Sequence, residues 1–107
     1  MNYMKSFFRK TFGESPKIKV LDFLLDNRTL DWCKSDIAEQ SGISRASLDR
    51  FFDQLVKDKV IIKSRTIGRA TLYKLNRKLP LVQKLIELDY LLTEKGQSKK
   101  EDSIKNI

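Results

Sequence analysis

Residues 34–55 read KSDIAEQSGISRASLDRFFDQL, and this stretch decides the fold. It carries the start and stop signals of two helices separated by a tight turn. Ser35 is a good N-cap for a first helix over residues 36–41, because its hydroxyl can accept a first-turn N–H. Gly42 then ends that helix, since glycine adopts positive φ at little cost. Ser44 caps a second helix, which we expect to run over residues 44–57.

The apolar residues of the second helix place it against a core. Leu48, Phe52 and Leu55 recur at steps of four and three, so they share one helix face. Ala38 lies four residues before Gly42 and is small enough to let two helices cross closely. A small residue, a glycine turn and apolar residues six and nine positions after the glycine, here Leu48 and Phe51, form a spacing typical of a helix-turn-helix. The alternative is an ordinary helical hairpin, in which the glycine only ends a helix.

A β-hairpin is predicted directly after the second helix. Residues 60–65 (VIIKSR) are rich in β-branched side chains, and residues 71–75 (TLYKL) return with alternating apolar positions. Gly68 lies in the turn between them. A hairpin in this position is called a wing, and we assign it to residues 63–74. Its basic side chains are Lys63, Arg65, Arg69 and Lys74.

Three elements precede the helical pair. Residues 1–14 carry an amphipathic stripe that could pack on the body of the protein or join a dimer interface. Ser15 and Pro16 then open a strongly apolar helix, which we expect to support the core and to end near Asn27. Residues 29–33 (TLDWC) fit a brief strand.

The last predicted helix spans residues 78–94 and contains the sequence LPLVQKLIELDYLL. Its leucines recur at steps of four, three and four, which is more apolar surface than a small domain needs to dock its final helix. We therefore predict a long C-terminal dimerisation helix with coiled-coil-like packing, and an intrachain core helix is the alternative. Residues 95–107 are polar, basic and without periodicity, and are expected to be disordered. The predicted dimer interface consists of Leu81, Leu85, Leu88 and Leu92.

Composition excludes several classes of site. The 107 residues can form one core, and no apolar run approaches the length of a membrane span. The net charge is +8, and residues 34–77 hold ten basic against five acidic side chains, which fits a polyanionic partner. A single cysteine, Cys33, and the absence of histidine leave no zinc cluster, catalytic triad or histidine base. We expect no enzyme activity, no metal, no cofactor, no membrane contact and a cytoplasmic location.

The order of these elements resembles that of winged helix-turn-helix transcription regulators, in particular the small archaeal and bacterial proteins of the MarR and ArsR type. The resemblance covers about residues 15–92, and its most specific parts are SDIAEQSGISRASLDRFFDQLVKDKVI and SRTIGRATLYKL. It implies a mainly α fold with a small β-hairpin (α+β) and a DNA-binding domain over residues 15–77. It also implies a recognition helix in the major groove, a wing on phosphate or in the minor groove, and a homodimer. Many ArsR-type sensors hold metal through cysteines or histidines, so this chain is not expected to sense metal.

The resemblance also implies which residues face DNA. Ser44 and Ser47 suit phosphate near a helix N-terminus, and Arg45 and Arg50 are long enough to reach base edges. Asp49 could accept a hydrogen bond from cytosine or pair with Arg45. The alternative for each position is a solvated surface side chain. The full predicted DNA-binding set is Lys34, Ser44, Arg45, Ala46, Ser47, Asp49, Arg50, Lys63, Arg65, Thr66 and Arg69.

Three functions remain open at this point. The favoured one is a homodimeric regulator of transcription that binds double-stranded DNA with sequence specificity. The second is a DNA-binding protein of plasmid or viral replication or partition with the same fold. The third is a winged helix that contacts only other proteins, against which the basic wing argues.

Overall fold

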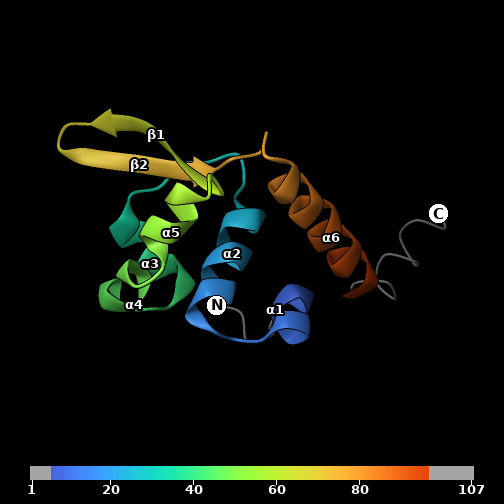
Figure 1. The fold of residues 1–107 in the computed structure, drawn as a ribbon. Helices are drawn as coiled ribbons and strands as arrows, with labels where there is room; N and C mark the ends of the chain where they lie inside the picture. Colours follow the sequence, from blue (N-terminus) through green and yellow to red (C-terminus); the bar gives the residue numbers. More distant parts are fainter. Residues whose placement is uncertain (1–5, 97–107) are drawn as a thin grey trace, which may run out of the picture.

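The structure is a computed structural model that describes residues 6–96 (Figure 1). Its predicted class is confirmed: the described part is mainly helical, with one antiparallel two-stranded sheet. No helix in this part of the chain is long and apolar enough to cross a membrane. In chain order the elements are α1 (Phe7–Phe12), α2 (Pro16–Asp26), α3 (Lys34–Ser41), α4 (Arg45–Asp49), α5 (Phe52–Lys57), β1 (Ile61–Ile67), β2 (Ala70–Leu75) and α6 (Pro80–Gly96).

Serine hydroxyls begin two of the predicted helices. The Ser15 hydroxyl accepts from the Ile18 N–H at 3.3 Å, and Pro16 occupies the first turn of α2, where its missing N–H costs nothing. The Ser44 hydroxyl accepts from the Ser47 N–H at 3.0 Å and begins α4. The predicted starts at residues 15 and 44 are therefore confirmed.

The predicted start of the first helix is wrong by two residues. We expected Ser35 to be the N-cap, but α3 already includes it and begins at Lys34. The cap is Cys33, whose carbonyl accepts from the Ile37 N–H at 3.0 Å and so starts the helical hydrogen bonds earlier. The prediction for Gly42 is confirmed: its φ is 75°, and its N–H bonds back to the last turn of α3.

Residues 44–57, called here the recognition segment, do not form the single helix that was expected. They form α4 and α5 with a turn at Arg50 and Phe51 between them. The N–H groups of these two residues bond to carbonyls three residues earlier, and Phe51 has φ −132°. The chain therefore tightens and bends at this point, while Leu48 and Phe52 on either side of the turn both remain buried.

The predicted hairpin is present, and its strands are longer than expected. Ile67 pairs with Ala70, so only Gly68 and Arg69 form the loop, and Gly68 takes φ 60°. The strand expected over residues 29–33 reduces to one bridge, in which Trp32 and Tyr73 exchange backbone hydrogen bonds of 2.8 Å. The wing is thereby tied to the segment between α2 and α3.

Helix α2 supplies the middle of the core, as its apolar sequence predicted. Figure 1 shows it between the α3–α5 group and α6. Its Val20, Leu24 and Leu25 are at most 1% exposed. The other fully buried apolar side chains come from α3, α4, α5, both strands and α6: Ile37, Leu48, Phe52, Ile61, Leu75 and Val82.

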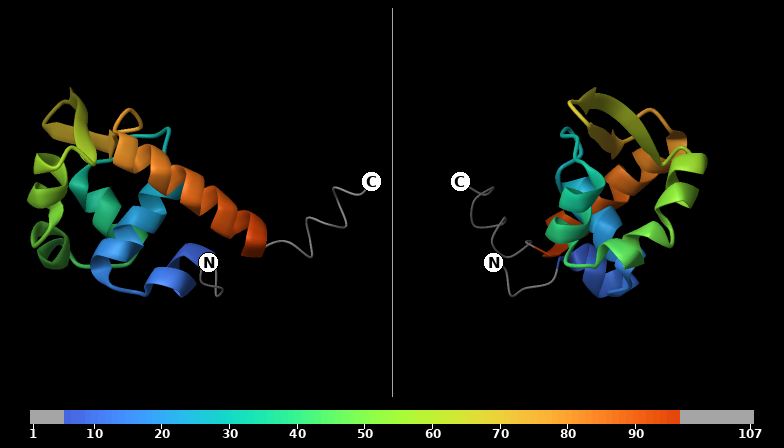
Figure 2. Two further views of the ribbon diagram at one scale, coloured as in Figure 1. Left: turned by 45° about the vertical axis from the view of Figure 1, so that its right-hand side comes forward. Right: turned by 90° about the vertical axis from the view of Figure 1, so that its left-hand side faces the viewer.

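The two outer helices pack together on the side of α2 away from the recognition segment. Figure 2 shows α1 beside the C-terminal part of α6 in both views. Phe8 of α1 is buried, so this helix packs back on the body, which is one of the two arrangements expected for residues 1–14. Disorder was predicted for residues 95–107, but α6 continues to Gly96, so the prediction is wrong for residues 95 and 96. Residues 1–5 and 97–107 lie outside the described part.

Candidate nucleic-acid interface

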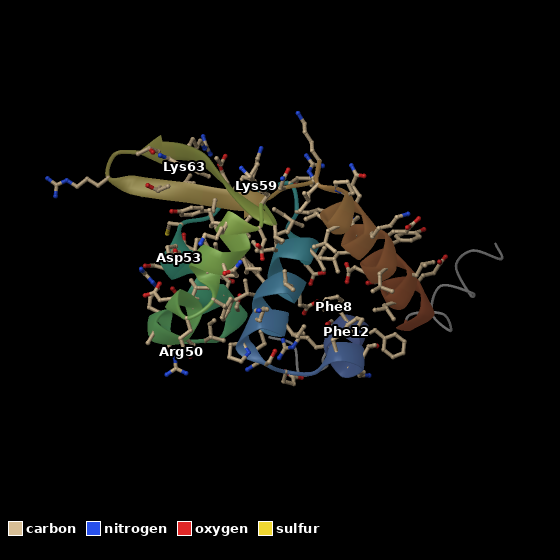
Figure 3. The ribbon with its side chains drawn as sticks, in the orientation of Figure 1. Phe8, Phe12, Arg50, Asp53, Lys59 and Lys63 are labelled. Atoms are coloured by element: carbon tan, nitrogen blue, oxygen red, sulfur yellow. The ribbon has the colours of Figure 1, made fainter. Side chains whose placement is uncertain are left out.

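The recognition segment presents one buried and one open face. Leu48, Phe52 and Leu55 are buried, as the periodicity predicted. On the open side, Ser47 is half-buried, and the rest of the set predicted for this segment is exposed: Ser44, Arg45, Ala46, Asp49 and Arg50. Figure 3 shows Arg50 extending away from the body at the lower end of the segment. The structure thus brings these residues onto one accessible surface.

An ion-pair cluster neutralises part of that surface. The Asp49 carboxylate lies 2.9 Å from the Lys34 ammonium and 3.9 Å from the Arg45 guanidinium. The hydrogen bond from Lys34, with a smaller effect of the Arg45 charge, holds the pKa of Asp49 below its ordinary value. Arg45 also donates to the Ser35 hydroxyl at 3.0 Å. Lys34 and Arg45 therefore already have partners inside the chain.

The wing also carries a cation that is paired with a carboxylate of the same chain. The Arg65 guanidinium forms a two-pronged contact with the Asp31 carboxylate, at 2.9 and 3.3 Å. A register shift between Lys63 and Arg65 interrupts the strand pairing, and Ser64 in between donates to Asp31 at 2.7 Å. These two hydrogen bonds, the one from Arg65 first, hold the pKa of Asp31 below its ordinary value. Arg65 thus anchors the wing to the segment before α3.

Aromatic contacts fix the wing relative to the recognition segment. The rings of Phe52 in α5 and Tyr73 in β2 meet edge to face with centroids 4.9 Å apart. Trp32, which bridges to the Tyr73 backbone, packs on Phe23 with ring centroids 5.0 Å apart. Trp32 is therefore a packing residue. The two surfaces expected to face DNA are therefore packed directly against each other.

Comparison with known proteins identifies this arrangement. NadR, solved in complex with 4-hydroxyphenylacetate, superposes with a TM-score of 0.64 at 18% identity, over 92% of this chain and 67% of that one. The AntR antimony-specific transcriptional repressor gives 0.57 at 21% identity, over 77% and 70%. The DNA-binding protein Sso10a-2 from Sulfolobus solfataricus gives 0.51 at 21%, over 83% and 93%. The chain has the winged helix-turn-helix fold. Neither a protein-family model nor a curated protein matches its sequence.

Within this winged helix-turn-helix, the remaining predicted cations have no acidic partner in the described part of the chain. Arg50, Lys63 and Arg69 form no ion pair there, and Arg69 lies in the two-residue loop at the wing tip. Thr66 is exposed on β1. The accessible positive charge of the predicted surface is therefore concentrated at Arg50 and along the wing.

Asp53 is a residue of this surface that sequence reasoning missed. It lies in the first turn of α5, is exposed, and follows Arg50 by three residues (Figure 3). Its carboxylate lowers the net positive charge at the start of α5.

The four leucines of the predicted dimer interface do not all face the same environment in the structure. Leu85 and Leu92 pack against the core of their own chain, and so do Val82 and Ile86. Leu81 and Leu91 are exposed by 55% and 54%, and Leu88, on the same side of the helix, is half-buried. The apolar stripe open to a partner is therefore Leu81, Leu88 and Leu91, called here the α6 stripe.

Three aspartate side chains from α2 and α6 lie close together, and the sequence did not predict this cluster. Oxygen atoms of Asp22, Asp26 and Asp89 all lie within 4.8 Å of one another, and Asp22 and Asp89 are buried. The expectation of no metal was drawn from cysteine and histidine alone and did not consider these oxygens. Burial, followed by the charges of the other two aspartates, raises the pKa of Asp26 to about 6.

This cluster should make the protein less stable as the pH rises. Burial also raises the pKa of Asp22 and Asp89. The folded chain thus keeps protons that the unfolded chain releases near pH 4, and the free energy of unfolding falls as the pH rises from about 4 to 6. Asp26 is exposed as a residue, so solvent screening leaves an effect of about 1 kcal/mol.

Asp26→Asn should therefore raise the free energy of unfolding at pH 7 by about 1 kcal/mol and flatten its pH dependence between pH 4 and 6. Urea unfolding at a series of pH values measures both. Asp53→Asn removes the same charge from an exposed site away from the cluster and should change neither. A loss of stability in Asp26→Asn at pH 7 would contradict the like-charge repulsion argued here.

Proposed function

We propose that this protein is a homodimeric regulator of transcription that binds double-stranded DNA with sequence specificity. The recognition segment enters the major groove, and the wing contacts the backbone or the minor groove. The observation that carries the proposal is the position of the unpaired cations. Arg50 lies on the open face of the recognition segment, and Lys63 and Arg69 lie on the wing, which Phe52 and Tyr73 fix to that segment.

The ion pairs refine which residues do what. Arg50 makes the base contact, because its guanidinium fork is free to bind guanine. Arg69 and Lys63 contact phosphate, which positions the protein without reading sequence. Lys34 and Arg45 share Asp49 and contribute less net charge. Arg65 is a positioning residue, since its guanidinium holds the wing through Asp31.

The similar structures support the DNA partner through their names. AntR is described as a transcriptional repressor and Sso10a-2 as a DNA-binding protein. A symmetric dimer would present two recognition segments to successive major grooves, roughly 34 Å apart, so the preferred site should be an inverted repeat.

Arginine variants test this division of roles. Arg50→Ala should cost about 1–3 kcal/mol on the preferred site and broaden sequence preference, as for a lost base contact. Arg69→Ala should weaken all sequences alike and lower the slope of log affinity against log salt by about one. Arg45→Ala should cost less than either, because its charge is already shared with Asp49. Selection from genomic DNA supplies the site, and fluorescence anisotropy measures binding to it and to a mixed-sequence duplex.

Asp49→Asn is the matched control for the ion-pair cluster. It frees both Lys34 and Arg45, so affinity for the mixed-sequence duplex should rise and the salt slope should steepen. An affinity of the unmodified chain that does not change between low and moderate salt would rule out the proposed function.

A further inference from the structure

A hollow of about 370 Å³ lies where the start of α2 meets the recognition segment. Its α2 side consists of Ser15, Pro16 and Lys17, and its other side of Ser47, Arg50 and Phe51. Half of its lining therefore belongs to the segment proposed to enter the major groove. The α2 side was not part of the DNA-binding surface predicted from the sequence.

The surface of the hollow is mostly apolar, and its two charged side chains are both cations. Lys17 and Arg50 contribute two positive charges, and the lining contains no acidic side chain. Neither cation forms an ion pair with any residue of the described chain, unlike Lys34, Arg45 and Arg65. An anion is the chemical partner that this lining complements.

The side chain of Lys17 points toward the recognition segment. Its ammonium lies 6.0 Å from the ring centroid of half-buried Phe51, at the turn between α4 and α5. The bend at Arg50 and Phe51 thus brings the arginine and the aromatic ring to the same opening as Lys17. The hydroxyl of Ser47 adds a short polar group to the rim.

The position of the hollow indicates which anion it meets. The wing lies beyond the upper end of the recognition segment, and the start of α2 lies beside its lower end (Figure 1). A helix in the major groove has a phosphate backbone along each edge of the groove. If the wing contacts one side, the hollow faces the backbone at the opposite end of the same segment.

We propose that this hollow holds one phosphate of the DNA backbone, contacted by Lys17 from α2 and lying next to the base contact of Arg50 in the recognition segment. The inference rests on the proposed function and extends it, because it adds α2 to the DNA interface. Lys17 contacts phosphate alone and carries no sequence information. Arg50 lies at the border between this phosphate and the base edges.

The test uses the full chain and a 30-base-pair duplex of mixed sequence. Lys17→Gln should lower affinity for every duplex alike and reduce the slope of log affinity against log salt by about 0.9, the value for one phosphate contact. Lys78→Gln is the matched control: it removes the same charge from an exposed lysine just before α6, and its slope should equal that of the unmodified chain. Thermal unfolding of both variants checks that the fold is intact.

A scan with neutral methylphosphonates locates the contact. On the preferred site, where the register is fixed, the substitution at one backbone position should weaken binding by the unmodified chain but not by Lys17→Gln, whose contact there is already lost. Titration with inorganic phosphate, followed through the amide NMR signals of residues 15–17, distinguishes a site for free anions from a contact with the DNA backbone. Shifts on phosphate addition without any position of this kind in the scan would overturn the proposal.

The outcomes also separate this inference from the proposed function. Failure of the unmodified chain to bind any duplex would sink both. If Arg50→Ala and Arg69→Ala behave as expected while Lys17→Gln matches Lys78→Gln, only the phosphate contact of the hollow is refuted.

Discussion

Replacing Leu81 and Leu88 together by aspartate should give a folded monomer that binds the preferred DNA site on the order of 100-fold more weakly than the unmodified chain. Both leucines belong to the α6 stripe, and neither packs in the core of its own chain. Two charges two turns apart on one side of α6 would have to be buried in any dimer that uses this side. A monomer engages one half-site, so dimerisation and specific affinity should be lost together.

The exposure of the α6 stripe is the physical reason to expect a partner. Leu81 and Leu91 expose more than half of their surface, and contiguous apolar patches on a small protein mark interaction sites. A second copy of the chain would cover the stripe with the same surface. The structure also decides which substitutions can test this. Leu85→Asp would charge a residue that packs against the core, so it would test folding rather than assembly.

Gln83→Asp with Tyr90→Asp is the matched control. These positions are also seven residues apart on α6 and exposed, but they lie on a different side of the helix. Sedimentation and binding to the preferred site should be unchanged in this variant. Equal disruption by both pairs would place the interface elsewhere on α6. A monomeric unmodified chain that binds an asymmetric single site tightly would refute the homodimer itself.

Local signals account for what could be predicted about this fold. Ser44, Gly42 and Gly68 act within a few residues of themselves, through a cap, a helix end and a hairpin loop. The helix order and the hairpin follow from such signals, and so does the burial of Leu48 and Leu55. These features carry the resemblance to winged helices, and the structure confirms that fold.

Contacts between distant residues account for what could not be predicted. Asp31 and Arg65 are 34 residues apart in the sequence, and no periodicity brings them together. The same holds for the carboxylate cluster, to which α2 and α6 both contribute. The contact with Asp31 therefore pairs a predicted DNA-binding cation, Arg65, in a way that the sequence did not indicate. The pair of Arg45 with Asp49, by contrast, is local.

The rotation of α6 about its own axis is a further feature that could not be predicted from the sequence. Its leucines recur all round one half of the helix, and the sequence alone could not say which of them face α1 and α2. Packing selects Leu85 and Leu92 for the core and leaves Leu81 open. A single amphipathic helix therefore serves the chain's own core and carries the proposed interface on an adjacent side.

Phe52→Ala should cost about 3–5 kcal/mol of the free energy of unfolding, the usual range for truncating a fully buried phenylalanine. The side chain is 1% exposed, and its ring meets Tyr73 of the wing edge to face. The ammonium of Lys34 also lies 4.9 Å from its ring centroid. Alanine would leave a cavity between α3, α5 and β2, and the wing would lose its contact with the recognition segment. A small domain has about 5–15 kcal/mol in total, so the variant should be only marginally folded at 37 °C.

Phe51→Ala is the matched comparison for Phe52→Ala. Phe51 is half-buried at the rim of the hollow, so its loss should cost only about 1 kcal/mol of apolar burial. Urea unfolding followed by circular dichroism measures both variants, and binding to the mixed-sequence duplex follows the effect on the site. The two neighbouring phenylalanines have the same chemistry, so the difference between them depends on the bend at residues 50 and 51. If Phe51→Ala proved the more damaging of the two, residues 44–57 would have to take a different rotation from the one that places Phe52 under the wing.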